Sequence, residues 1–474
     1  MIVLFLIRVL EGLYFFQATG YHYHRFFKNA LSRIYVYFLP SLLFFFFLLN
    51  NILINHLVVF VLSIYYIILL KKQKKRLVFT RRIIRLLSLS FFIGIVLAFI
   101  NIRFLIFPYT TLILSSLILI PIEHFINKSY IDKARDKILS FKGKIIGITG
   151  SYGKTSTKNY LYEMLSKRYL VLKSPKSYNT LLGIAKTINE NPIELYDFLI
   201  LEMGASRNGD IEKILDLVTP DFGIITNIGY QHMETFIKVE NILKEKALLV
   251  DRAKEKGIIN IDDPRLRCYS FIQDVISFGK NGDYEAKGVN ECSFDLFEKK
   301  KYLGRIKTNL LGCHNVNNLL ASIALSRYLN VSFIDIKDAS LSLKNVEARL
   351  EYKKYNNMHI LNDSFNANLD GAISAIKELS KYDMPRYIIT PGFVEMASYK
   401  ENHHIRFAEE IMDKRIIPFL VGKKQTRIIQ EELKKNSYPF YLFKSFKEAY
   451  QAFMAQNRTK ACALLIENDL PDGY

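Results

Sequence analysis

The hydrophobic pattern divides the chain into an apolar N-terminal part and a longer part in which short apolar runs alternate with amphipathic stretches. Long apolar runs without a polar face cover residues 34–49, 52–70, 87–100 and 104–122. Residues 1–17 form a further run, interrupted by Arg8 and Glu11. Such runs predict four or five membrane-spanning helices. We therefore expect a transmembrane helical region over residues 1–126 and a linker over 127–140.

Basic residues concentrate in the same apolar part. Residues 1–140 contain 17 Lys and Arg against 4 Asp and Glu, so 17 minus 4 assigns +13 of the net charge of +20 to this part. Because basic loops stay in the cytoplasm, the loops around residues 21–33 and 71–85 are placed inside and the chain returns to the cytosol near residue 127. The charge thus indicates a multi-pass protein of the cell membrane with cytoplasmic C-terminal domains, rather than nucleic acid binding.

Beyond Phe141 the pattern predicts α/β structure. The runs KIIGIT, DFLILEM, FGIITNI and GIINI are typical of buried parallel strands, with helical stretches between them. This alternation predicts a doubly wound central domain over residues 141–343, with a weaker strand-rich interval over 268–311. A smaller, Rossmann-like α/β domain is expected over 344–474, with MHILND, RYIITPG and IIPFLVG as strands.

The four cysteines carry no metal or disulfide pattern. Cys268, Cys292, Cys313 and Cys462 are scattered, with no CxxC spacing and no matching histidine cluster. They fit a reducing cytosol and argue against a zinc site.

The stretch GITGSYGKTSTK, residues 147–158, predicts a phosphate site. It follows an expected strand and opens an expected helix at Lys154, where backbone N–H groups can cradle phosphates. Lys154 would neutralise the β- and γ-phosphates of ATP, and the Thr155 hydroxyl would ligate Mg²⁺. The strict GxxxxGK[ST] pattern fails, because Ile148 stands where it requires glycine.

The departure is informative, because TGSYGKTSTK resembles the ATP loop of the Mur ligase superfamily, and most closely that of its D-alanyl-D-alanine-adding branch. The resemblance extends from residue 141 to about 425. It implies a nucleotide-binding set comprising Gly150, Ser151, Gly153, Lys154, Thr155 and Ser156.

Two further motifs extend the resemblance to metal ligands. LEMGASRNGDI resembles the family segment whose glutamate binds Mg²⁺, here Glu202, although a lone Glu is more often a surface charge. TNIGYQHMETF resembles the segment whose histidine binds a second Mg²⁺, here His232, although an isolated His is often structural. In ENILKEKALLV, Lys246 takes the place of a lysine that CO₂ carbamylates in the family. A solvated helix lysine is the alternative, and Lys244 is a rival position.

Motifs in the second half of the resemblance imply contacts with the nucleotide base. LLGCHNVNNLLASIALS resembles the family segment whose amides face adenine, which implicates Asn315 and Asn318; for Asn315 a helix cap is the alternative. EARLEY and LNDSFNANLDG place Arg349 and Asp363 at the nucleotide.

Other motifs imply contacts with the reacting groups. Asn366 follows Asp363 in LNDSFNANLDG, where Phe365 and Leu369 replace the usual Tyr and Pro. KSYNTLLGI matches a loop that faces the γ-phosphate and the acyl acceptor, implicating Asn179 and Thr180.

Taken with the resemblance, these parts predict an ATP-dependent amide-bond ligase. A carboxylate of a cell-wall peptide precursor would be phosphorylated and the acyl phosphate attacked by an amino acid or dipeptide, with Lys154, Lys246 and His232 as catalytic residues and ATP and Mg²⁺ bound. The membrane region stands where the family carries its UDP-binding domain, and the segments GFVEMASYKENHH and ENDLPDGY depart from the family, so soluble and lipid-linked acceptors both stay open. The competing interpretations are a membrane-coupled P-loop ATPase or transport component, and a catalytically silent scaffold.

Overall fold

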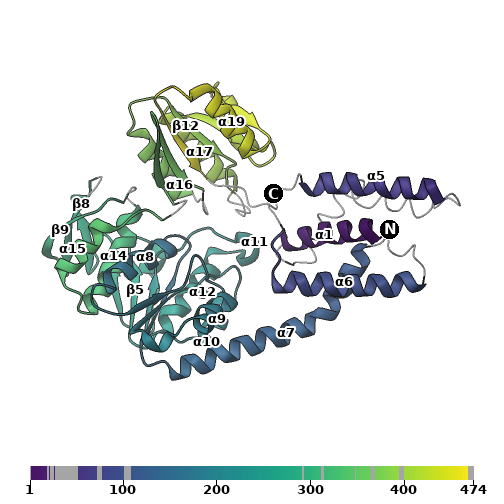
Figure 1. Ribbon diagram of the computed structural model, residues 1–474. Helices are drawn as coiled ribbons and strands as arrows, with labels where there is room; N and C mark the ends of the chain where they lie inside the picture. Colours follow the sequence, from purple (N-terminus) through teal and green to yellow (C-terminus); the bar gives the residue numbers. More distant parts are fainter. Residues whose placement is uncertain are drawn as a thin grey trace. The chain divides into compact units, whose positions relative to one another are not determined.

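The computed structural model describes residues 2–18, 21, 26, 52–71, 77–100, 108–290, 293–310, 314–346, 349–364, 369–393 and 400–467 (Figure 1). The described chain divides into two compact units, the first ending at Lys128 and the second beginning at Ser129. The first unit is helical and the second holds two α/β domains.

The described part of the first unit consists of α1 (Ile2–Ala18), α5 (Ile52–Lys71), α6 (Arg81–Ile100) and the part of α7 (Pro108–Ser140) that precedes Ser129. Two of them, Arg81–Ile100 and Tyr109–Ser140, are long and apolar enough among the described residues to cross a membrane. The expected span over 34–49 lies outside the described residues.

The helical unit encloses a charged pair that interrupts the apolar run of α1. The Arg8 guanidinium donates to a Glu11 carboxylate oxygen at 2.6 Å, and the Tyr109 hydroxyl donates to the same oxygen at 3.2 Å. Arg8 also lies over the ring of Tyr66, 4.0 Å from its centroid. Both charged side chains are buried, and buried charges need such partners. This pair explains how an apolar helix accommodates two ionisable residues.

The central domain is built on a sheet of nine strands in the order β2-β3-β1-β4-β5-β6-β7-β8-β9. Its parallel part comprises β1 (Lys144–Thr149), β2 (Val171–Lys173), β3 (Phe198–Glu202), β4 (Phe222–Ile225), β5 (Lys256–Asn260) and β6 (Val275–Phe278). The sheet continues through β7 (Tyr284–Lys287), β8 (Ser293–Glu298) and β9 (Lys301–Lys307), of which β7–β8 and β8–β9 pair antiparallel. The strand-rich interval expected from the sequence is therefore an extension of the same sheet.

Helices cover both faces of this sheet because alternate strand residues point to opposite sides. One face packs against α8 (Lys154–Leu165), α14 (His314–Tyr328) and α15 (Phe333–Ser342). The other packs against α9 (Leu181–Glu190), α10 (Asp210–Leu217) and part of α12 (Val239–Asp251), while α11 (Met233–Phe236) and α13 (Pro264–Arg267) are single turns. A 3₁₀ turn spans Ile193–Leu195. The segment 127–140, expected as a linker, is the helical end of α7, and its Ala134 is buried in this second core.

The C-terminal domain has a six-stranded sheet in the order β10-β11-β15-β12-β13-β14. Its strands are β10 (Glu351–Tyr355), β11 (Met358–Asp363), β12 (Arg386–Thr390), β13 (Ile417–Val421), β14 (Tyr441–Phe443) and β15 (Cys462–Glu467). All neighbours pair parallel except β10 and β11. The helices are α16 (Leu369–Ser380), α17 (Lys400–Asp413), α18 (Arg427–Lys435) and α19 (Phe446–Asn457). The last strand in sequence, β15, thus lies between β11 and β12.

Candidate active site

The phosphate loop connects β1 to α8 and contains two glycines in backbone conformations that other residue types rarely adopt. Gly150 has φ 147° and Gly153 has φ 79°, both in the region that favours glycine. A Cβ on Gly150 would lie 1.9 Å from the Thr226 hydroxyl, and one on Gly153 would lie 2.2 Å from Asn318 Oδ1. The loop therefore packs directly against β4 and α14, and α8 begins at Lys154 as the sequence predicts.

The segment after β4 holds the tip of the phosphate loop in place through hydrogen bonds. The Ser151 amide donates to the Asn227 carbonyl at 3.0 Å, and the Tyr152 amide donates to Asn227 Oδ1 at 2.9 Å. The Gly229 amide donates to Ser151 Oγ at 2.8 Å, and the Thr226 hydroxyl donates to the Tyr152 carbonyl. The motif TNIGYQ is thus a structural support for the phosphate loop as well as the segment that leads to His232.

The carboxyl ends of β1 and β3 bring together Lys154, Thr155 and Glu202. The Lys154 ammonium donates to the carbonyls of Gly150 and Ser151, at 2.7 and 3.3 Å. The Thr155 hydroxyl donates to Glu202 Oε2 at 2.9 Å. Burial lowers the pKa of Lys154 to about 8, against the opposing attraction of Glu202. Burial alone would raise the pKa of Glu202, but the charges of Lys158 and Lys154 hold it below its ordinary value.

Lys158 is a residue of this cluster that belongs to the sequence motif but received no predicted role. It lies one turn after Lys154 on α8, is 1% exposed, and donates to Glu202 Oε2 at 3.1 Å and to the carbonyl of Lys176. Burial lowers the pKa of Lys158, while Glu202 opposes that shift. A lysine four positions beyond the motif lysine on a helix lies on the same face, so the spacing was a usable signal.

Lys246, on α12, contacts the phosphate loop at Ser151. Its ammonium donates to Ser151 Oγ at 2.8 Å, and its side chain is buried, whereas the rival Lys244 is exposed. Burial and the nearby charge of Lys154 lower the pKa of Lys246 well below its ordinary value. The amine of Lys246 is therefore held in the environment that favours its neutral form.

His232 lies in a strained turn. Its φ is 53°, in the left-handed region, and it precedes the single turn of α11. Ile237, which ends that turn, has φ 66° and ψ −46° and is 74% exposed. A β-branched residue rarely adopts positive φ, so this segment stores backbone strain beside the predicted ligand.

Asn315 and Asn318 join the start of α14 to α8. The Tyr160 hydroxyl donates to Asn315 Oδ1 at 3.0 Å, the Asn318 amide donates to the same atom at 3.3 Å, and the Thr157 hydroxyl donates to Asn318 Oδ1 at 3.4 Å. Both Asn side chains are buried. Their amides thus have a structural use in holding two helices together.

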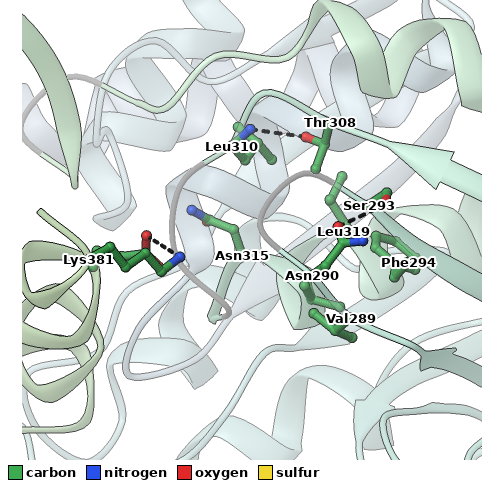
Figure 2. A pocket seen from close by; sticks show the side chains of 11 residues that line it. Val289, Asn290, Ser293, Phe294, Thr308, Leu310, Asn315, Leu319 and Lys381 are labelled. Atoms are coloured by element: carbon green, nitrogen blue, oxygen red, sulfur yellow. Dashed lines mark hydrogen bonds and ion pairs between the residues drawn. The ribbon is translucent and has the colours of Figure 1, made fainter.

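Asn315 also lines a cavity of about 220 Å³. Figure 2 shows its side chain between Lys381, which follows α16, and Asn290, which precedes β8. The remaining lining is mostly apolar, from Val289, Phe294, Leu310, Val316 and Leu319. Polar groups come from Ser293, Thr308 and Glu378 as well as from the two asparagines and Lys381, so the cavity combines apolar walls with several polar side chains.

The loop KSYNTLLGI brings only one of its two predicted side chains to the carboxylate. Asn179 Nδ2 donates to Glu202 Oε1 at 3.3 Å. Thr180 is the N-cap of α9, and its hydroxyl accepts from the Gly183 amide at 3.2 Å. Thr180 therefore has a local capping role in this structure.

Arg349 and Asp363 reach the cluster from the C-terminal domain. Arg349 Nη2 donates to Thr155 Oγ1 at 3.2 Å, and the Leu350 amide donates to Asp363 Oδ1 at 3.0 Å. Burial raises the pKa of Asp363 to about 6, although the Leu350 hydrogen bond and the Arg349 charge oppose it. The predicted substrate residue Asn366 lies outside the described residues.

The donor set at Thr155 and Glu202 fits Mg²⁺. A carboxylate and a hydroxyl at 2.9 Å are hard oxygen ligands, and Mg²⁺ commonly takes one or two protein ligands together with phosphates and water. Among the described residues, no group of three or more His, Cys, Asp or Glu side chains could hold a metal ion. A second metal position at His232 stays a prediction.

The fold and the site define a phosphate-loop α/β protein in which a second α/β domain supplies an arginine to the loop. Residues 148–326 match the Mur ligase middle domain. This part of the chain therefore matches a domain of the Mur ligase family, and the chain is distantly similar to MurF.

Curated relatives of this chain carry the name UDP-N-acetylmuramoyl-tripeptide–D-alanyl-D-alanine ligase. The protein of Bacillus subtilis is 30% identical over 269 residues, which are 55% of this chain and 58% of that protein. The protein of Borreliella burgdorferi is 27% identical over 328 residues, 64% of this chain and 68% of that one. The chain thus spans little more than half the length of the first of these relatives.

Solved structures share the fold of the second unit. MurF from Acinetobacter baumannii superposes with a TM-score of 0.65 at 20% identity, covering 72% of this chain and 77% of that one. The MurF ligase from Thermotoga maritima in complex with ADP gives 0.63 at 24% identity, covering 72% and 80%. At these identities the likeness establishes the fold.

Proposed function

We propose that this protein is a membrane-anchored, ATP-dependent amide-bond ligase acting on a cell-wall peptide precursor. The observation that carries the proposal is the convergence of Lys154, Lys158, Thr155 and Glu202 with Arg349 from the other domain. Three cations around one phosphate loop suit a reaction in which two anions, ATP and a carboxylate, must meet.

The residues divide the work of the reaction. The γ-phosphoryl group of ATP passes to the acceptor carboxylate, and an amine then displaces phosphate from the acyl phosphate to form the amide. Lys154, Lys158 and Arg349 offset the charge that accumulates during transfer. Glu202 and Thr155 would hold Mg²⁺, which supplies charge neutralisation at the phosphates when bound. Asn179, hydrogen-bonded to Glu202, would orient the acceptor carboxylate.

The cavity beside Asn315 is proposed to receive the adenine base. Its apolar walls suit a planar ring, and the amide can donate to and accept from the base edge. Asp363 and Arg349 would then lie on the side of the nucleotide nearer the phosphates. The adenine base and the phosphates of ATP would then both lie against the central domain. The C-terminal domain would supply residues near each of these two ends.

Lys246 is proposed to carry a carbamate. Carbamylation needs a neutral amine, and burial beside Lys154 favours that form. The product is an anion, which would pair with the Lys154 ammonium or with a cation, whereas an unmodified ammonium would repel both. His232, the other proposed ligand, would bind the same cation as the carbamate.

The apolar N-terminal helices support a membrane anchor with the ligase domains on the cytoplasmic side. Two described helices have the length and composition of a span, and the basic excess lies in the same part of the chain. Anchoring raises the effective concentration of the site toward an acceptor that is itself lipid-linked. We therefore place lipid-linked precursors beside soluble UDP-linked ones as candidate acceptors.

The test is amine-dependent ADP release by the purified full-length protein. ADP release is measured with UDP-linked and lipid-linked peptide precursors and with D-alanyl-D-alanine as donor, and the product is identified by mass. Lys154→Ala is expected to abolish turnover and leave the melting temperature close to that of the wild type or above it. ADP release that needs no amine would instead favour a membrane-coupled ATPase, and undiminished release in Lys154→Ala would refute the assigned site.

A further inference from the structure

Tyr230 packs against the hydrophobic cores of two domains. It follows β4 in the motif TNIGYQH and is half-buried. In the central domain it lies against the buried cluster that contains Ile228 and Met233. It also lies against the core of the C-terminal domain, which contains Leu369 and Phe407. An aromatic ring buries a large apolar area, so Tyr230 joins these two domains through packing.

The ring of Tyr230 also has a partner of its own in each domain. In the central domain, the guanidinium of Arg265, on α13, lies over the ring, 5.8 Å from its centroid. Arg265 also donates to the Ile228 carbonyl at 2.6 Å, which holds the guanidinium beside the backbone that precedes the ring. From α17 of the C-terminal domain, the His403 ring lies 5.5 Å from the Tyr230 ring, at an interplanar angle of 57°. The position of the Tyr230 ring thus depends on both domains.

The backbone beside Tyr230 supports the phosphate loop. The Gly229 amide donates to Ser151 Oγ at 2.8 Å, and Ser151 Oγ lies 3.2 Å from the Gly229 carbonyl. That carbonyl also accepts from the Gln231 amide at 2.9 Å, which closes a tight turn centred on Tyr230. A Cβ on Gly229 would lie 2.4 Å from the ring of Tyr152, so the tip of the phosphate loop packs directly against this glycine. A displacement of Tyr230 would therefore move the backbone that holds the loop tip.

We propose that Tyr230 is a positioning residue for the ligase reaction, an inference that rests on the nucleotide site of the function proposed above. Its ring packs on the C-terminal domain, and the turn centred on it fixes Gly229 against Ser151. Docking of the C-terminal domain and ordering of the phosphate loop then stabilise each other, because both depend on this residue. Arg349 provides a separate link, since it reaches Thr155 at the start of α8.

The alternative interpretation is that Tyr230 only holds the two domains together. Both interpretations predict a weaker domain contact when the ring is lost, but they differ at the phosphate loop before nucleotide binds. The amides of Ser151 and Tyr152 donate to the carbonyl and the side chain of Asn227, at 3.0 and 2.9 Å, and Asn227 belongs to the same segment as Tyr230. Only the coupling predicts that removal of the ring weakens these two hydrogen bonds.

The experiment uses the full-length, detergent-solubilised protein and two measurements. Amide hydrogen exchange of a peptide covering residues 147–153 is followed without nucleotide, and ADP affinity is measured by calorimetry. Tyr230→Ala should speed this exchange and weaken ADP binding, each by roughly tenfold, the scale of one aromatic contact. His403→Ala should act in the same direction by roughly threefold, and it should add nothing in the Tyr230→Ala background, because both substitutions remove the same link. Tyr230→Phe, which keeps the ring, should behave like the wild type.

The matched control is Tyr269→Ala, which removes another half-buried tyrosine of the central domain. Its ring packs on Phe271, and its hydroxyl donates to Asp251 at 3.0 Å. This variant should change neither the exchange of the loop peptide nor the affinity for ADP. Should Tyr230→Ala not fold, Tyr230→Leu takes its place, because leucine keeps an apolar side chain without the ring contacts.

Several outcomes would overturn the inference. They are unchanged loop exchange or unchanged ADP affinity in Tyr230→Ala, an equal effect of Tyr269→Ala, and independent effects of the Tyr230 and His403 substitutions. A Tyr230→Phe protein as impaired as Tyr230→Ala would do the same, because the ring would then not be the link. Loop exchange is measured without nucleotide or turnover. A wild type that shows the coupling but forms no amide would therefore count against the proposed function alone.

Discussion

Replacing Lys154 by methionine should stabilise the protein at neutral pH while abolishing nucleotide turnover. Folding lowers the pKa of Lys154 from 10.5 to about 8, so burying its charged form costs about 3 kcal/mol, at about 1.4 kcal/mol for each pKa unit. Methionine keeps the apolar stem and removes that cost. It also removes the two hydrogen bonds to the carbonyls of Gly150 and Ser151, worth about 1 kcal/mol each. The expected net gain at pH 7 is about 1 kcal/mol.

The sign of the pH dependence follows from the same pKa. Between about pH 8 and 10.5 the unfolded chain holds a proton on Lys154 that the folded protein has lost, so the stability of the wild type rises with pH in this window. Below it the full cost of the buried charge is present. The advantage of Lys154→Met should therefore shrink by roughly 2.5 kcal/mol between pH 7 and 10 and change sign, leaving the variant less stable by about 1 kcal/mol.

The assay is the thermal unfolding of the α/β domains in both proteins between pH 7 and 10, without nucleotide. Lys167→Met, which changes an exposed lysine after the same helix, is the matched control, and its difference from the wild type should not follow this course. A Lys154→Met protein that is less stable at pH 7, by an amount that does not vary with pH, would refute the reasoning from burial.

Two further predictions concern the segment from His232 to Lys246. Ile237→Gly should raise the free energy of unfolding by about 1 kcal/mol, because it relieves a positive φ at a residue that is 74% exposed. The control Ile272→Gly, at an 80% exposed position outside the left-handed region, should lower the free energy of unfolding. A loss of stability in Ile237→Gly on chemical denaturation would contradict the assigned strain. Removal of CO₂ should lower the ligase activity of the wild type, and added bicarbonate should restore it. Lys246→Arg should be inactive at any bicarbonate concentration, whereas Lys244→Arg should respond like the wild type. ¹³C-bicarbonate NMR that detects no carbamate in the active wild type would contradict the assignment of Lys246.

The local pattern predicted the parallel strands of both domains well. KIIGIT, DFLILEM and FGIITNI correspond to β1, β3 and β4, and the start of α8 at Lys154 is confirmed. These features depend on short-range signals, namely buried apolar runs and a glycine turn. From His232 onward the chain forms two helices, α11 and α12, and Ile237 between them takes a positive φ that no periodicity reveals.

The sequence alone did not predict which residues far apart in the chain contact one another. The partnership of Lys158 with Glu202 joins residues 44 positions apart, and that of Arg349 with Thr155 joins residues 194 positions apart. The strand CALLIE, which is β15, escaped notice, so the sequence did not place Glu467 beside Asp363. Only the strand order of the sheet brings these two residues together.

The central place of β15 has a consequence for how the C-terminal domain is made. β11 ends at Asp363 and β12 begins at Arg386, yet the strand that pairs with both begins only at Cys462. During synthesis, β11 and β12 therefore leave the ribosome with open edges and wait for the rest of the domain to follow. The sheet closes late and through contacts of long sequence separation, which slows folding and exposes strand edges to other chains. We expect chaperones to engage the growing chain chiefly over this interval.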